Sequence, residues 1–200
     1  MQWLRGFVNL MRDFSKRTKG VYRLADLLLK YSLQAIGRVL EAKPDMVSFG
    51  DDWGTQERLM VSPLFWREFF KPKYRKMFDL VHDHGAYVWF HSDGYIMDII
   101  PDLYEIGVNV LWPQFSCHNL EELAEATRER ICVASDIDRQ YIMPRGTPEE
   151  ARAYVKRVID LFGYGSNGSL LGRGEVNIDV PLENVEAVYE TFFTYGRYAW

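Results

Sequence analysis

Apolar residues recur along this chain with two different periods, and residues 86–102 contain both. The first five, AYVWF, are apolar or aromatic and predict a buried strand of a parallel sheet. The pattern breaks at His91-Ser92-Asp93-Gly94 and then resumes with helical spacing. Because residues i and i+2 of a strand share a face, His91 and Asp93 can point at one ligand. Two such residues can also simply cap the next helix, and the spacing alone leaves both interpretations open.

Similar patterns divide the rest of the chain into alternating strands and helices. Strands are expected at residues 45–50, 86–90, 108–114, 131–138 and 168–176. Helices are expected at residues 2–14, 21–42, 62–85 (bent at Pro72, with Ser62 as N-cap), 95–106, 120–130, 147–162 (with Thr147 as N-cap) and 181–195. Among the strand residues, we expect Phe49, Val88, Phe90, Val110 and Leu171 in the core.

Strictly alternating strands and helices predict an α/β fold with a parallel sheet and right-handed crossovers. No G-x-G-x-x-G follows the first strand, so a dinucleotide-binding fold has no support. Polar residues instead follow several consecutive strands, which favours part of a (β/α)8 barrel, with about five of its βα units present. These residues are Asp51, Asp52, His91, Asp93, Gln114, Asp136, Asp138, Arg173 and Glu175. We expect Asp52, His91, Asp93 and Glu175 to share one pocket.

Composition narrows the class of protein. The 200 residues, with a formal net charge of −4, suit one globular domain over 1–200. Basic residues are interleaved with acids, which argues against nucleic-acid binding. Apolar runs are short or broken by charge, and the N-terminus is amphipathic, so we expect no membrane span, no signal sequence and a cytoplasmic protein. Cys117 and Cys132 fit a reducing compartment and are expected to be buried apolar residues.

Five short motifs spread over nearly the whole chain resemble one known family. Asp51-Asp52-Trp53-Gly54 is similar to acidic-Ser-Trp-Ala-Gly, His91-Ser92-Asp93-Gly94 to His-x-Cys-Gly, Ala134-Ser135-Asp136-Ile137-Asp138 to Gly-Asn-x-Asp-Pro, Leu171-Gly172-Arg173-Gly174 to Leu-Gly-His-Gly, and Val180-Pro181-Leu182-Glu183-Asn184-Val185 to Thr-Pro-x-Glu-Asn-aliphatic. Together they resemble the uroporphyrinogen decarboxylase superfamily, which also contains corrinoid-dependent methyltransferases. The resemblance implies a (β/α)8 barrel whose first three strands are absent here.

The resemblance also implies roles for the residues at the strand ends. The related methyltransferases hold zinc with His-x-Cys and a later Cys, and here His91, Asp93 and Glu175 stand in that set. Imidazole and carboxylate both ligate zinc, and such a harder site suits a substrate oxygen, for example that of a methyl ether, better than a thiol. The implied catalytic residues are Asp52, Asp136 and Arg173, the last in place of a histidine. The implied substrate-binding residues are Asp51, Trp53, Gln114 and Asp138.

Three functions follow as alternatives. The first is a methyltransferase-like enzyme that moves a methyl group between a small substrate and a corrinoid held by a partner protein. The second is a uroporphyrinogen decarboxylase of porphyrin biosynthesis, which needs no metal, although the arginine cluster and the aspartate that grip the substrate would lie in the absent strands. The third is a non-catalytic barrel fragment serving as a partner subunit. Strands near Val47 and Leu170 would be edges, so we expect self-association or a companion chain.

Overall fold

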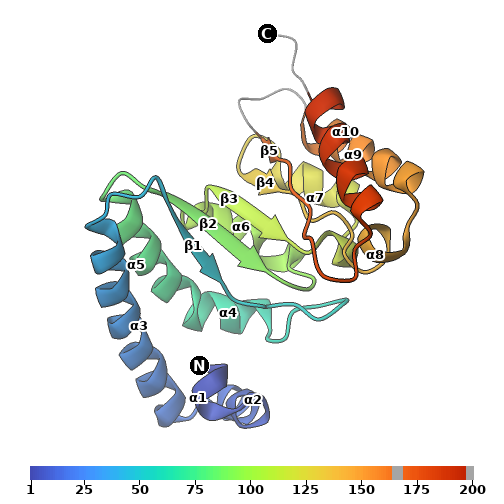
Figure 1. Cartoon of the computed structure of the whole chain (residues 1–200). Coiled ribbons are helices and arrows are strands. Elements are labelled where there is room, and N and C mark those ends of the chain that lie inside the picture. The colour runs from blue at the N-terminus through green and yellow to red at the C-terminus, as the bar shows by residue number, and fades with distance from the viewer. Residues whose placement is uncertain (164–168, 197–200) are drawn as a thin grey trace.

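A sheet of five parallel strands is the centre of the fold (Figure 1). The computed structural model describes residues 1–163 and 169–196. The strands are β1 (Met46–Gly50), β2 (Tyr87–Ser92), β3 (Val110–Pro113), β4 (Cys132–Ala134) and β5 (Leu170–Leu171). Each pairs in parallel with the next strand in the sequence, so the described sheet has no topological switch point. This order confirms the predicted α/β class and is that of a partial (β/α)8 barrel.

Helices connect and cover the strands (Figure 1). They are α1 (Gln2–Arg5), α2 (Phe7–Lys16), α3 (Lys19–Leu40), α4 (Pro63–Phe69), α5 (Lys71–His82), η1 (Met97–Ile99), α6 (Ile100–Glu105), η2 (Phe115–Cys117), α7 (Leu120–Thr127), α8 (Ile142–Arg145), α9 (Pro148–Phe162) and α10 (Leu182–Tyr195). Both predicted N-caps are confirmed, because Ser62 Oγ accepts a hydrogen bond from the N–H of Phe65 at 3.2 Å and Thr147 forms a capping box with Glu150.

Several predicted boundaries were wrong for identifiable reasons. The helix expected over 2–14 is divided at Gly6, whose φ of 77° suits only glycine well. The helix expected to bend at Pro72 is instead two helices that meet at Phe70, with Pro72 in the first turn of α5, where its missing N–H is not needed. The helices expected over 95–106 and 120–130 are shorter, and the last strand forms only at Leu170–Leu171. Gly168, where that strand was expected to begin, lies outside the described residues.

The core lies between the sheet and the helices of one face. Phe90 is fully buried and its ring centroid lies 5.5 Å from that of Tyr74 on α5. Burial of Val88, Phe90 and Val110 is confirmed, and each such side chain stabilises the fold by about 2 kcal/mol. Phe49 is half-buried, and the prediction for Leu171 was wrong, because it is 38% exposed on the short edge strand β5. Cys117 is buried as expected, whereas Cys132 is half-buried.

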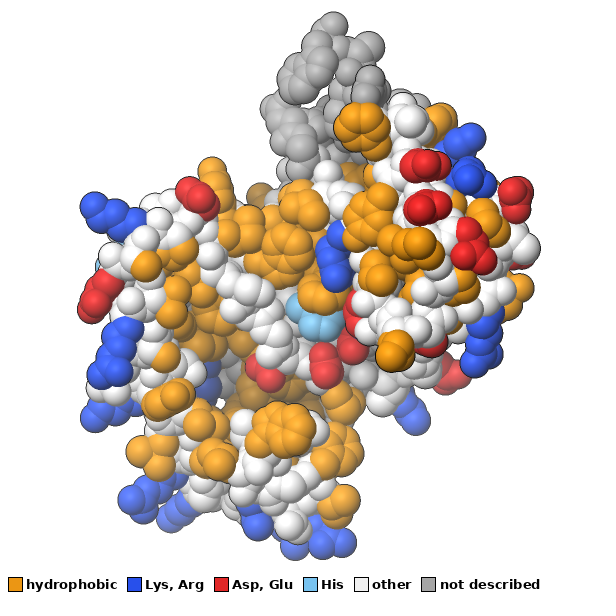
Figure 2. Space-filling model, viewed as in Figure 1, with side chains coloured by type: hydrophobic (Ala, Val, Ile, Leu, Met, Phe, Trp, Pro, Cys, Tyr) orange, Lys and Arg blue, Asp and Glu red, His pale blue; other side chains and the backbone are white. Residues whose placement is uncertain are grey.

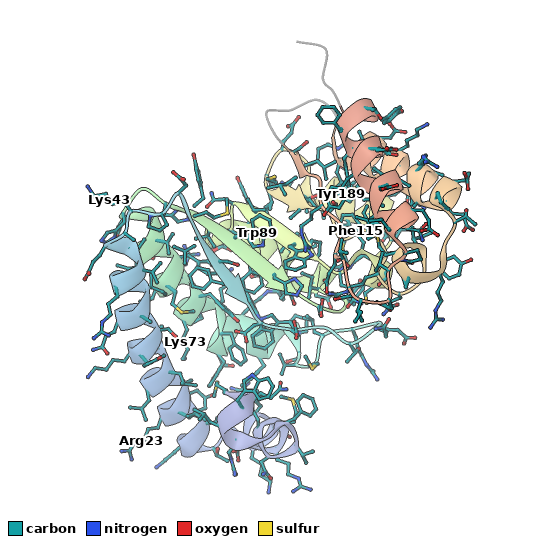
Figure 3. The ribbon with its side chains drawn as sticks, viewed as in Figure 1. Arg23, Lys43, Lys73, Trp89, Phe115 and Tyr189 are labelled. Carbon is teal, nitrogen blue, oxygen red and sulfur yellow. The ribbon has the colours of Figure 1, made fainter. Side chains whose placement is uncertain are left out.

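The opposite face of the sheet is more open. Tyr87, Trp89 and His91 alternate along β2 with the buried residues, and they are exposed or half-buried. Figure 3 labels Trp89 in the middle of this sheet. Figure 2 shows a histidine and a basic side chain among hydrophobic ones near the middle of the molecule.

In the described ranges, no helix is both long and apolar enough to cross a membrane.

Candidate functional site

Two glycines bring the ends of β1 and β2 into backbone contact. Gly94 has a φ of 77°, and a Cβ atom added to it would lie 2.2 Å from the carbonyl carbon of Gly54. The N–H of Gly54 donates to the carbonyl oxygen of Asp93 at 3.0 Å. The N–H of Asp93 in turn donates to Asp52 Oδ1 at 3.2 Å. The close approach therefore places two acidic residues from different strand ends side by side.

Asp52, His91 and Asp93 form a compact cluster at this edge of the sheet. His91 Nε2 lies 3.4 Å from Asp93 Oδ1 and 3.9 Å from Asp52 Oδ1. One candidate ligand atom from each residue lies within 4.8 Å of the other two. The side chains are 61% (Asp52), 19% (His91) and 36% (Asp93) exposed, so a small ligand can reach them from solvent.

A hydrogen bond to the backbone of Trp112 sets the orientation of the His91 ring. The Nδ1 atom lies 3.0 Å from the carbonyl oxygen of Trp112, and because a carbonyl only accepts, Nδ1 carries the proton. Nε2 therefore faces the carboxylates. Burial lowers the pKa of His91, but the hydrogen bond to Asp93 and its charge outweigh burial, so the pKa is raised. The His91 hydrogen bond is also the main reason that the pKa of Asp93 is lowered.

This arrangement fits a bound cation. An unprotonated Nε2 presents a lone pair to two carboxylates, which is unfavourable unless a proton or a metal ion lies between them. One imidazole nitrogen and two carboxylate oxygens are ligand types that zinc takes, and three protein ligands leave a position for substrate. Asp52, His91 and Asp93 are thus the described residues that could hold a metal.

The structure places Glu175 at the same edge but attaches it to Arg139. Arg139 Nη1 donates to Glu175 Oε2 at 2.9 Å, and Nη2 donates to Asp93 Oδ1. Arg139 Nε lies 3.8 Å from Asp136 Oδ2. Of the four residues expected in one pocket, Asp52, His91 and Asp93 lie together, and Arg139 links Glu175 to Asp93. Asp52 rather than Glu175 completes the group of candidate ligand atoms around His91.

Asp136 and Arg173 both contact the side chain of Trp112. The guanidinium carbon of Arg173 is 3.6 Å from the centroid of the Trp112 ring, whose Nε1 donates to Asp136 Oδ1 at 3.4 Å. Asp136 is completely buried, and this burial raises its pKa to about 6. Asp136 Oδ2 and Arg173 Nη1 are buried polar atoms with no hydrogen-bond partner among the described residues. A carboxyl whose pKa burial raises to about 6 thus lies in the field of a cation.

The four expected substrate-binding residues are all engaged in local structure. The Asp51 carboxylate accepts from the hydroxyl of Tyr74, which itself accepts from Trp53 Nε1 at 3.2 Å. Gln114 Oε1 accepts from the N–H of Gly94 at 2.9 Å, and Asp138 Oδ1 accepts from the N–H of Gln140 at 2.8 Å. Their expected role in substrate binding stays a prediction. Gln114 holds the loop that carries Asp93, and Asp138 holds the loop that carries Arg139.

A cleft of about 360 Å³ adjoins the cluster. Asp51, Asp52 and Trp53 form one wall, and apolar side chains of α2, α3 and α5 form the others, among them Phe14, Leu28 and Met77. Asp52 is the residue of the cluster that also lines this cleft.

Sequence reasoning missed Arg139, Trp112 and Tyr74. Arg139 directly follows Asp136-Ile137-Asp138, so a basic residue next to a strand-end acid was an available signal. Trp112 and Tyr74 carry no such signal, since an aromatic residue in a strand or an amphipathic helix is most often core.

The comparisons with known proteins fit this geometry. The family model described as uroporphyrinogen decarboxylase (URO-D) matches residues 2–195. The chain belongs to the URO-D family. Membership confirms the resemblance that the five motifs indicated and accounts for polar residues at the ends of consecutive barrel strands. No curated protein matches the chain.

A solved structure shares the fold of this URO-D chain. A methyltransferase from Methanosarcina mazei superposes with a TM-score of 0.72 at 18% sequence identity. The match covers 94% of this chain and 53% of that one, so the chain spans about half the length of this relative. At this identity the likeness establishes the common architecture.

Proposed function

We propose that this URO-D family member is a methyltransferase-like enzyme with a His/carboxylate zinc site. The observation that carries the proposal is the cluster of Asp52, His91 and Asp93, whose ligand atoms lie within 4.8 Å of one another at the ends of two neighbouring strands. Glu175, the third ligand expected from the sequence, is held by Arg139 through its Nη1, so Asp52 completes the proposed set.

The residues around the cluster have distinct proposed roles. A zinc ion bound there would supply a Lewis acid for a substrate oxygen, such as that of a small methyl ether or alcohol. Trp112 orients His91 through its carbonyl oxygen. Asp136, with a pKa of about 6, holds or releases a proton, and Arg173 beside it binds a negative charge. Asp51, Trp53, Gln114 and Asp138 keep their proposed part in positioning the substrate.

The proposed methyl carrier is a corrinoid bound to a partner protein in the cytoplasm. The proposal is supported by family membership and by the fold shared with a methyltransferase.

We further propose that β1 and β5, each with one neighbour in the described sheet, pair with strands of another chain or a second copy. A monodisperse monomer in light scattering contradicts this pairing. That residues 1–200 form a single domain lacking the first three barrel strands stays a prediction.

A methyl-transfer assay tests the function. Zinc-loaded protein is incubated with methylcobalamin as the corrinoid probe and with a panel of small alcohols, phenols and thiols, and demethylation of the corrinoid is followed by its absorption. Transfer to an oxygen acceptor should require zinc and be lost in His91→Ala. His84→Ala is the control, because His84 is exposed and hydrogen-bonds within its own helical turn. Transfer that persists in His91→Ala contradicts the proposed site.

A decarboxylase is the second candidate, favoured by Asp136 and Arg173. A proton-holding acid beside a guanidinium can bind a substrate carboxylate and protonate the carbon that loses it. This reaction needs no metal, so a chelator separates the candidates. Uroporphyrinogen decarboxylation that survives chelation and is lost in Asp136→Asn supports the decarboxylase, and zinc-dependent methyl transfer supports the methyltransferase.

A further inference from the structure

Arg139 joins the ends of three strands at the proposed metal site. Its guanidinium contacts the carboxylates of Asp93 after β2, Asp136 after β4 and Glu175 after β5. The Arg139 side chain is only 18% exposed. One half-buried cation therefore balances part of the charge of three carboxylates, and each of its three guanidinium nitrogens faces a different one.

The loop that carries Arg139 is held in place by Asp138. Asp138 Oδ1 accepts from the N–H groups of Gln140 and Tyr141 at 2.8 and 3.1 Å, and its carbonyl oxygen accepts from the N–H of Met143 at 2.8 Å. A loop with these bonds has little freedom to carry Arg139 elsewhere. Contact with the carboxylates therefore depends on the rotamer of the arginine side chain, which can change without unfolding the loop.

Arg139 and a metal ion would share one oxygen atom. Asp93 Oδ1 accepts from Arg139 Nη2, and the same atom lies 3.4 Å from His91 Nε2, toward the candidate ligand position. A divalent ion on this oxygen would lie within a few ångströms of the guanidinium, where two cations repel strongly in a partly buried site.

We propose that Arg139 is a built-in counter-cation that competes with the metal ion for Asp93. Arg139 neutralises the carboxylates, and metal binding displaces its Nη2 from Asp93 while Glu175 retains the guanidinium. This inference rests on the proposed metal site. The opposite role, in which Arg139 positions Asp93 for the ion, predicts the opposite effect on affinity.

Zinc titration of matched variants tests the competition. Calorimetry with zinc alone as the probe compares wild type, Arg139→Gln, Arg139→Lys and Arg157→Gln. Arg157 pairs with Glu121 at the surface, so its variant loses the same charge away from the site. Arg139→Gln should bind zinc about tenfold more tightly or better, whereas Arg139→Lys and Arg157→Gln should stay close to wild type.

A second measurement uses the wild-type protein. With nitrogen-labelled arginine, the side-chain NMR signal missing from the Arg139→Lys spectrum identifies Arg139, and it should shift during the zinc titration. If wild type binds zinc but Arg139→Gln binds it with equal or lower affinity, the competition is wrong and the metal site stands. The same conclusion follows if the Arg139 signal does not shift while wild type binds zinc. Zinc binding by neither protein overturns the metal site itself, and the competition with it.

Discussion

His91 and Trp112 are held together by two contacts that fix which nitrogen of the imidazole faces the cluster. Nδ1 of His91 lies 3.0 Å from the Trp112 carbonyl oxygen, and the two ring centroids are 4.0 Å apart. Because the Nδ1–H of His91 donates a hydrogen bond to this carbonyl of β3 and keeps its proton, only Nε2 is left to titrate or to bind an ion beside Asp52 and Asp93.

Zinc affinity should therefore depend on pH. Protons and zinc compete for Nε2, and the pKa of His91 is raised because the effect of Asp93 outweighs burial. We expect the affinity to fall as pH is lowered, with the decrease beginning above the ordinary histidine pKa of about 6.5. Calorimetry at several values between about pH 8 and about pH 6 measures this decrease. A constant affinity over that interval is incompatible with Nε2 as a ligand.

Asp136 should make the protein less stable as pH rises. Burial raises its pKa to about 6, so between the unfolded value of 3.8 and about 6 the native state holds a proton that the unfolded state has lost. Stability from this group is thus present at low pH and is lost as pH rises through about 6. Asp136→Asn should be more stable than wild type above that pH by about 2 kcal/mol.

Urea unfolding of both proteins on either side of pH 6 checks this expectation. Asp79→Asn, which changes an exposed residue of α5, serves as the control and should leave the pH profile unchanged. If the stability of Asp136→Asn follows the wild-type pH profile, the pKa of Asp136 is not raised in the folded protein and this expectation is wrong.

Gly94→Ala should disrupt the loop contact that assembles the cluster. The added methyl group would overlap the backbone of Gly54, and a φ of 77° is strained for alanine. We expect a loss of about 3 kcal/mol in unfolding free energy, together with weaker zinc binding. Gly37→Ala is the matched control, because this glycine lies within α3 with open space around it and should gain about 1 kcal/mol. Equal stabilities of the two variants would contradict the close approach.

The meeting of polar residues at one edge of the sheet was predictable, because chain order and the alternation of side chains along a strand determine it. His91 and Asp93 follow an apolar run, and Asp52 follows another, so their meeting at one edge follows from a parallel sheet. The contact between Glu175 and Arg139 was not predictable, since it depends on the conformations of two long side chains in the loops after β4 and β5. Leu171 was misassigned for a related reason: an apolar residue of an edge strand is buried only if another element covers it.

Metal content tests the central claim most directly. Wild type, His91→Ala and His84→Ala are incubated with zinc, freed of unbound metal by dialysis and analysed for zinc per chain by mass spectrometry. If Asp52, His91 and Asp93 form the site, wild type and His84→Ala should carry one zinc per chain and His91→Ala should carry almost none, because two remaining ligands hold the ion too weakly. Stoichiometric zinc in His91→Ala, or none in wild type, would contradict the account.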